Sequence, residues 1–127
     1  MTLRSSLVAL GATVLLFGAV GCGSEDTGPA AVSQTLRITA TEYAFGGESA
    51  TITAGETIRF ELVNEGEIDH ELQLLNSDGR ILGQIERLAP GQSGSLEVNF
   101  DEPGVYTVIC DIDDHQILGQ TASFAVE

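Results

Sequence analysis

Residues 105–120 read Val-Tyr-Thr-Val-Ile-Cys-Asp-Ile-Asp-Asp-His-Gln-Ile-Leu-Gly-Gln. The segment begins as a β-strand at 105–110, because β-branched and aromatic residues are enriched in strands. It then places three electron-pair donors within eleven residues: the thiol of Cys110, the imidazole of His115 and the amide oxygen of Gln120. The end of this strand therefore carries three candidate metal ligands.

The other histidine of the chain, His70, lies 40 residues before Cys110, at the start of a segment of alternating apolar residues. This segment can pair with the strand that ends at Cys110, and the pairing would bring the two side chains together. Two imidazoles and one thiolate, completed by a weak axial oxygen or thioether, are the ligand set that suits copper in electron transfer. The pattern predicts a site for one copper ion.

The chain after residue 33 shows the two-residue periodicity of β-strands. Leu36, Ile38 and Ala40 alternate with polar residues. No segment shows a clear repeat of apolar residues at the three- and four-residue spacing of an amphipathic helix. Further strands are expected at 50–53, 58–62, 70–75, 81–85, 96–100, 105–110 and 121–126, separated by turn residues that include Gly46-Gly47 and Pro103-Gly104. This pattern predicts an all-β fold, an antiparallel Greek-key β-sandwich of about 7–8 strands.

The N-terminal 21 residues have the features of an export signal. Arg4 supplies the positive start, and the run from Leu7 to Val20 is uncharged and apolar. The ending Ala19-Val20-Gly21-Cys22 resembles the lipidation site of bacterial lipoproteins, with Ala19 where leucine is commonest. An uncleaved membrane anchor is the alternative, although the run is short for a membrane span.

A change of composition marks the start of the folded part. Residues 22–33 are small, polar and turn-prone, which predicts a flexible tether. Residues 34–127 are expected to form one domain, because this length supports a single core but not two. Signal and tether together predict export and anchoring, through a lipid on Cys22, at the outer face of a cell membrane or in the periplasm.

The net charge limits the kinds of partner molecule that the chain can bind. The chain has 19 acidic and five basic residues, a formal charge of −14, which excludes nucleic acid as a partner. The acidic surface serves solubility or steers the protein towards a basic redox partner.

With Cys22 lipidated, Cys110 is the only remaining thiol, and an unpaired thiol is unusual in an exported protein unless it is buried or held by a metal.

Beyond the candidate ligands, nearly all of 34–127 resembles the blue copper proteins, or cupredoxins. The matching pieces are Ile38–Phe45 as the first strand, Ala54–Phe60 as the turn into the third, Asn64–Leu72 as the loop that delivers the first histidine, and Ala89–Ser93 with Phe100–Cys110 as the hairpin and strand of the cysteine ligand. Each piece alone is weak, because many sandwiches use similar turns. Their order along the chain carries the resemblance.

The resemblance implies that His70, Cys110 and His115 are the equatorial copper ligands. It places Gln120 in the axial position, where most of the family has methionine and the stellacyanin-like members have glutamine. An amide oxygen is a harder donor than a thioether, so it should favour Cu(II) and lower the reduction potential. The alternative for Gln120 is a polar residue at the start of a strand.

Carboxylates flank two of these ligands, whereas the family often has a hydroxyl residue after the cysteine and an amide or carboxylate after the first histidine. Glu71 follows His70, and Asp111 follows Cys110. Negative charge near the metal should further favour the oxidised ion. These side chains can equally point into water, as most acidic loop residues do.

The expected function is that of a monomeric electron carrier, not an enzyme, which passes single electrons between redox partner proteins. Two other functional hypotheses use the same ligands. One is copper capture, storage or delivery, and the other is a non-blue copper site or small copper enzyme in which Glu71 or an aspartate replaces the weak axial donor. A metal-free sandwich in adhesion is the remaining alternative. A binuclear centre is disfavoured because it needs a second nearby cysteine.

Overall fold

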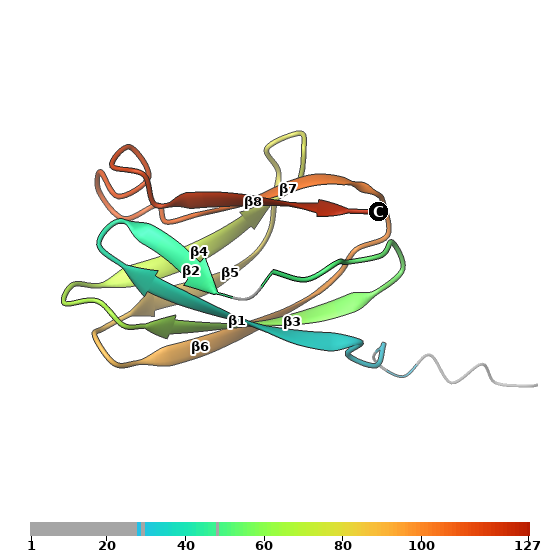
Figure 1. The fold of residues 1–127 in the computed structure, drawn as a ribbon, viewed down its shortest axis with the longest axis horizontal. Helices are drawn as coiled ribbons and strands as arrows, with labels where there is room; N and C mark the ends of the chain where they lie inside the picture. Colours follow the sequence, from blue (N-terminus) through green and yellow to red (C-terminus); the bar gives the residue numbers. More distant parts are fainter. Residues whose placement is uncertain (1–27, 29, 48) are drawn as a thin grey trace, which may run out of the picture.

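The computed structural model describes residue 28, residues 30–47 and residues 49–127 (Figure 1). The predicted signal at 1–21, the lipidation site Cys22 and much of the tether at 22–33 lie outside the described residues. In the described part of the chain, no helix has the length and apolar character needed to cross a membrane.

Two four-stranded sheets pack face to face, which confirms the predicted all-β sandwich (Figure 1). One sheet has the order β2-β1-β3-β6 and the other the order β5-β4-β7-β8. The strands are β1 (Gln34–Thr41), β2 (Ala44–Gly47), β3 (Thr57–Asn64), β4 (His70–Leu75), β5 (Ile81–Leu88), β6 (Ser93–Asn99), β7 (Gly104–Ile109) and β8 (Thr121–Val126).

One strand pairing departs from the antiparallel expectation. β1 and β3 run parallel, with Gln34 opposite Ile58 and Ala40 opposite Asn64, whereas the other named pairs are antiparallel. Parallel neighbours need a long crossover connection. Here β2 and the segment after it provide that connection, which periodicity along single strands cannot reveal.

Two local predictions around this crossover were wrong. No strand forms at 50–53, where Ile52 makes only an isolated bridge to Val126. Gly46-Gly47, interpreted as a turn, instead belongs to β2. A Cβ at Gly46 would lie 2.9 Å from Thr39 Oγ1, and one at Gly47 would overlap the backbone of β1. The two glycines therefore do not form a turn; they allow two strands to approach closely, which is another reason for glycine to occur within a sheet.

Aromatic rings fill the interior between the sheets. Phe100 lies edge-on to Tyr106, with ring centroids 4.8 Å apart, and edge-on to Phe60 at 6.1 Å. Edge-to-face geometry at these separations is favourable beyond the burial of apolar area. This core fixes β3 of one sheet against β7 of the other, and β7 leads directly into Cys110.

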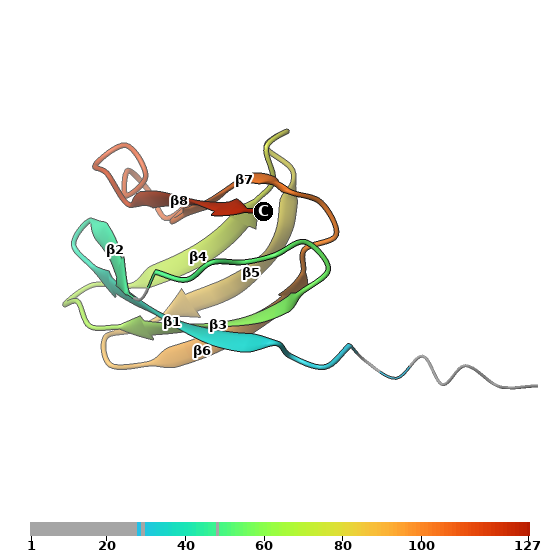
Figure 2. The ribbon, with the colours of Figure 1, turned by 45° about the vertical axis from the view of Figure 1, so that its right-hand side comes forward.

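Connections from both sheets gather at one end of the sandwich, on the left in Figures 1 and 2. They include the short connection between β5 and β6, the turn between β1 and β2, the loop between β3 and β4, and the long loop between β7 and β8. All the candidate ligands lie in or beside the last two of these connections.

Candidate metal centre

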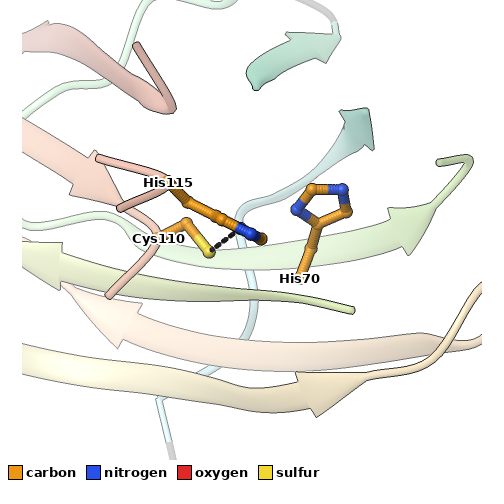
Figure 3. A group of neighbouring side chains, drawn as sticks. All are labelled: His70, Cys110 and His115. Carbon is orange, nitrogen blue, oxygen red and sulfur yellow. Dashed lines mark hydrogen bonds between the residues drawn. The ribbon is translucent and has the colours of Figure 1, made fainter. Parts of the chain in front are cut away.

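His70, Cys110 and His115 form a buried cluster at this end (Figure 3). One potential ligand atom from each residue lies within 4.8 Å of those of the other two. Cys110 Sγ is 3.4 Å from His115 Nδ1, and the two imidazole centroids are 5.2 Å apart. The structure therefore brings together three residues that are separated by up to 45 positions in the sequence.

Strand pairing accounts for the approach of the first two residues. β4 pairs with β7, and Gln73 lies opposite Ile109. Because the strands are antiparallel, the start of β4 meets the end of β7. His70 opens β4 and Cys110 follows β7, so both side chains lie at the same edge of the sheet and point into the sandwich.

The loop between β7 and β8 folds back through backbone hydrogen bonds. The amide of Gln120 donates to the carbonyl of His115 at 2.9 Å, and the amide of Cys110 donates to the carbonyl of Gln120 at 3.2 Å. These bonds place Gln120 directly beside the two ligand candidates of its own loop. Gly119 has a φ of 116°, which suits glycine, so it allows the chain to turn into β8.

Asn64 stabilises the loop that leads to His70. Its side chain is fully buried, donates to the carbonyls of Ile68 at 2.7 Å and Leu88 at 2.9 Å, and accepts from the amide of Gly66 at 2.9 Å. Three of the amide's hydrogen-bonding positions are thus used internally. The loop is tied to β5 just before it delivers His70.

Four buried polar atoms at the centre have no hydrogen-bond partner among the residues that the structure describes. They are both ring nitrogens of His70 and both amide atoms of Gln120, and each of these residues has 0% exposed area. Buried polar groups are normally satisfied, so unpartnered ones call for an explanation such as a bound ion. The donor set of two imidazoles, a thiol and an amide oxygen fits copper.

Burial raises the pKa of the Cys110 thiol above its ordinary value in the metal-free protein. Hydrogen bonding from the backbone amides of Glu71 and Ile112 acts in the opposite direction, and the charge of Glu71 adds to the rise. Since metals bind the thiolate, loading the site must release the thiol proton.

The acidic residues beside the ligands do not enter the cluster. Glu71 is half-buried on β4, where burial alternates, and its carboxylate accepts from Gln73 Nε2 at 3.4 Å. Asp111, Asp113 and Asp114 are exposed. Within the described ranges, no carboxylate joins the three-residue group. The geometry thus favours the water-facing alternative for these side chains and gives no support to a carboxylate axial donor.

Two contacts from the β1–β2 turn were missed by the sequence analysis. Glu42 Oε1 lies 3.5 Å from His70 Nε2, and the Tyr43 ring packs edge-on against His115 with centroids 5.0 Å apart. A hydrogen bond from the backbone amide of Glu67 lowers the pKa of Glu42 below its ordinary value, which keeps the carboxylate ionised at neutral pH. No motif marks these residues, because they reach the site only through the pairing of distant segments.

An all-β sandwich with a buried His-Cys-His cluster at one end defines a copper protein of cupredoxin type. In agreement, the family model described as "Cupredoxin-like domain" matches residues 9–121. The chain belongs to the cupredoxin-like family, and its cofactor is one copper ion.

The chain is 33% identical over 102 residues to the copper-resistant cuproprotein CopI of Pseudomonas aeruginosa. The match covers 74% of this chain but only 55% of that relative's length. Among solved structures, auracyanin B superposes with a TM-score of 0.70 at 22% identity, covering 77% of this chain and 91% of auracyanin B.

Two further solved structures share the fold. The reduced auracyanin of Roseiflexus castenholzii gives a TM-score of 0.67 at 19% identity, covering 76% of this chain and 99% of that chain. Auracyanin A of Chloroflexus aurantiacus, described as a "blue" copper protein, gives 0.64 at 16% identity, with coverage of 73% and 98%. At these identities the likeness establishes the fold alone.

Proposed function

We propose that the chain is a mononuclear type 1 copper protein that carries single electrons between redox partners. The buried cluster of His70, Cys110 and His115 carries this proposal, with Gln120 as the axial ligand. Copper bound there would supply a one-electron couple between Cu(I) and Cu(II). In this role the protein catalyses no reaction of its own.

Each residue has a distinct task in this proposal. Cys110 supplies the thiolate, and His70 and His115 supply the imidazoles. Gln120 supplies a hard amide oxygen that disfavours Cu(I). The backbone bonds within the loop and the sheet edge beneath it hold these donors in place, so little rearrangement accompanies electron transfer.

The visible absorption of the purified protein with one equivalent of Cu(II) tests the proposal. A covalent copper–thiolate bond should give an intense visible band. Cys110→Ser should abolish the band and leave the β-sheet circular dichroism unchanged. Cys22→Ser, which alters the other cysteine of the chain, is the matched control and should retain the colour. A folded wild-type protein that binds copper without colour would refute the type 1 assignment.

Copper capture or delivery is the second candidate, and the relative named a copper-resistant cuproprotein favours it. The two functions differ in redox behaviour. An electron carrier should give a reversible one-electron wave and fast self-exchange between its oxidised and reduced forms. A capture protein should hold one oxidation state strongly and release it slowly. Protein-film voltammetry and stopped-flow oxidation separate the two.

The proposal places the protein outside the cytoplasm. Residues 1–21 would be removed on export, Cys22 would carry a lipid, residues 22–33 would act as a tether, and residues 34–127 would meet redox partners as a monomer. The lipidation-like sequence at Cys22 supports the anchoring, and the acidic charge supports partners with basic surfaces.

Mass spectrometry of the membrane-extracted protein should find a diacylglycerol on Cys22. A mature form that starts elsewhere would contradict it.

A further inference from the structure

Glu42 is held in one position at the edge of the metal centre. Its Oε1 accepts hydrogen bonds from the backbone amides of Glu67 at 2.6 Å and Ile68 at 3.1 Å. An exposed glutamate normally samples several rotamers, and these two bonds restrict it. The same oxygen lies 3.5 Å from His70 Nε2, an electrostatic contact at the outer limit of an N–H···O hydrogen bond.

The contact faces the side of His70 that is turned away from the cluster. Figure 3 shows one ring nitrogen directed towards Cys110 and His115 and the other directed away from them. The nitrogen directed towards the cluster adjoins the ring carbon that carries the side-chain stem, so it is Nδ1, and Nε2, the nitrogen beside Glu42, is the one directed away. The ring has 0% exposure, and among the described residues neither of its nitrogens has a hydrogen-bond partner of ordinary geometry.

Gly66 permits this arrangement. A Cβ at this position would overlap Glu42 Oε1 and lie 2.9 Å from His70 Nε2. The backbone of the loop therefore covers the carboxylate and the imidazole together. Any larger residue would have to displace one of them, so the approach of Glu42 to His70 is built into the loop.

We infer that Glu42 is a positioning residue that acts on the metal centre through His70. Its carboxylate favours the tautomer with the proton on Nε2, which leaves the Nδ1 lone pair free for copper. A carboxylate behind a ligating histidine fixes the ring and raises its basicity. Its negative charge also stabilises Cu(II) relative to Cu(I). This inference rests on the proposed ligation of copper by His70.

Three variants separate the hydrogen-bonding role from the charge. Glu42→Gln keeps an oxygen that the amides of Glu67 and Ile68 can hold, and it removes only the charge. Glu42→Ala removes both. Glu67→Gln removes one negative charge from a neighbouring exposed side chain, in the loop between β3 and β4, and serves as the control.

The first measurement uses the metal-free protein. Long-range nitrogen–proton NMR correlation in mildly alkaline buffer, where free histidine is neutral, reports the tautomer of His70. We expect the Nε2–H form in the wild type, in Glu42→Gln and in the control, and a mixture of tautomers in Glu42→Ala. A merely structural role for Glu42 would leave the tautomer unchanged in all four proteins.

The second measurement uses the copper-loaded protein. Glu42→Ala should lower Cu(II) affinity by about 10- to 100-fold, the usual effect of losing such a partner. Glu42→Gln should lower the affinity for Cu(II) relative to Cu(I) by about tenfold, which raises the reduction potential by about 59 mV. The control should change this ratio by less than about threefold, because an exposed charge is screened.

An unchanged tautomer in Glu42→Ala, or equal shifts of potential in Glu42→Gln and Glu67→Gln, would overturn the inference. Should Glu42→Ala fail to fold, the comparison of Glu42→Gln with the control decides. Failure of the proposed function is distinguishable, because it would appear as a colourless copper-loaded wild type. The tautomer of His70 in the metal-free protein would then still show whether Glu42 positions this histidine.

Discussion

Single residues at the centre combine burial with unused bonding capacity. Gln120 is fully buried, and its amide has no partner in the described part of the chain, although an unpaired buried polar group is destabilising. The pKa of Cys110 is raised mainly by burial, so the thiol keeps its proton in the metal-free state. Copper must displace that proton, and the affinity for copper should therefore rise with pH.

Gln120→Met tests the axial ligand. A thioether is a softer donor than an amide oxygen and interacts more weakly with Cu(II), so the reduction potential should rise. We expect a rise of about one to three steps of 59 mV, each step being a tenfold shift in relative affinity. Gln116→Met, which alters an exposed glutamine of the same loop, should leave the potential unchanged. An unchanged or lower potential in Gln120→Met would exclude Gln120 as the axial donor.

Strands were predictable wherever one face is buried and the other is wet. β3 alternates in burial from Ile58 onwards, and its period of two is visible in the sequence. β2 was missed because its glycines, which permit close packing on β1, have the same composition as a turn. The equatorial ligand candidates could be proposed because their residue types are rare in this chain. Glu42 could not, because its contact with His70 depends on how two separate loops meet.

The hydroxyl of Tyr106 ties β7 to the turn before it, donating to the carbonyl of Glu102 at 2.8 Å. Burial, together with the nearby charges of Glu102 and Asp101, raises the pKa of Tyr106 above its ordinary value of 10.0. The folded protein thus keeps this proton at a pH where the unfolded chain loses it. The stability that Tyr106 contributes is fully present below about pH 10 and is lost as the pH rises through its folded pKa.

Tyr106→Phe should lower the free energy of unfolding by about 1 kcal/mol at neutral pH, because one hydrogen bond is lost and the ring is kept. The difference between wild type and variant should shrink above about pH 10, since only the wild type loses stability through this phenol. Urea unfolding of the metal-free proteins at several pH values measures both effects. A difference that stays constant or widens with alkaline pH would contradict the argument.

Exposed acidic side chains lie around the copper end of the protein. The formal charge is −14, and exposed acidic residues of this end include Glu65, Glu67, Asp113 and Asp114. Arg37 and Arg87 lie close to carboxylates of the same end, Glu65 and Asp69. Exposed ion pairs contribute little to stability. The excess charge therefore acts mainly on association with other molecules.

Electron exchange with small charged reagents measures this field directly. Oxidation of the reduced copper protein by the tris(phenanthroline)cobalt(III) cation should slow as ionic strength rises, because salt screens an attraction. Oxidation by the hexacyanoferrate(III) anion should accelerate, because salt screens a repulsion. Stopped-flow rates between about 0.01 and 0.5 M salt span Debye lengths from about 30 Å to less than 8 Å, so the cation rate should fall by about tenfold or more.

Variants of two exposed aspartates test which part of the surface causes the salt dependence of electron exchange. Asp114→Asn removes a charge from the loop that carries His115, whereas Asp78→Asn removes one from the turn beyond the far end of β4. Both variants have the same net charge. If electrons enter at the copper end, Asp114→Asn should weaken the salt dependence more than Asp78→Asn, because fields fall off within a Debye length. Equal effects would mean that only the net charge matters, and the acidic end would then have no special part in meeting a basic partner.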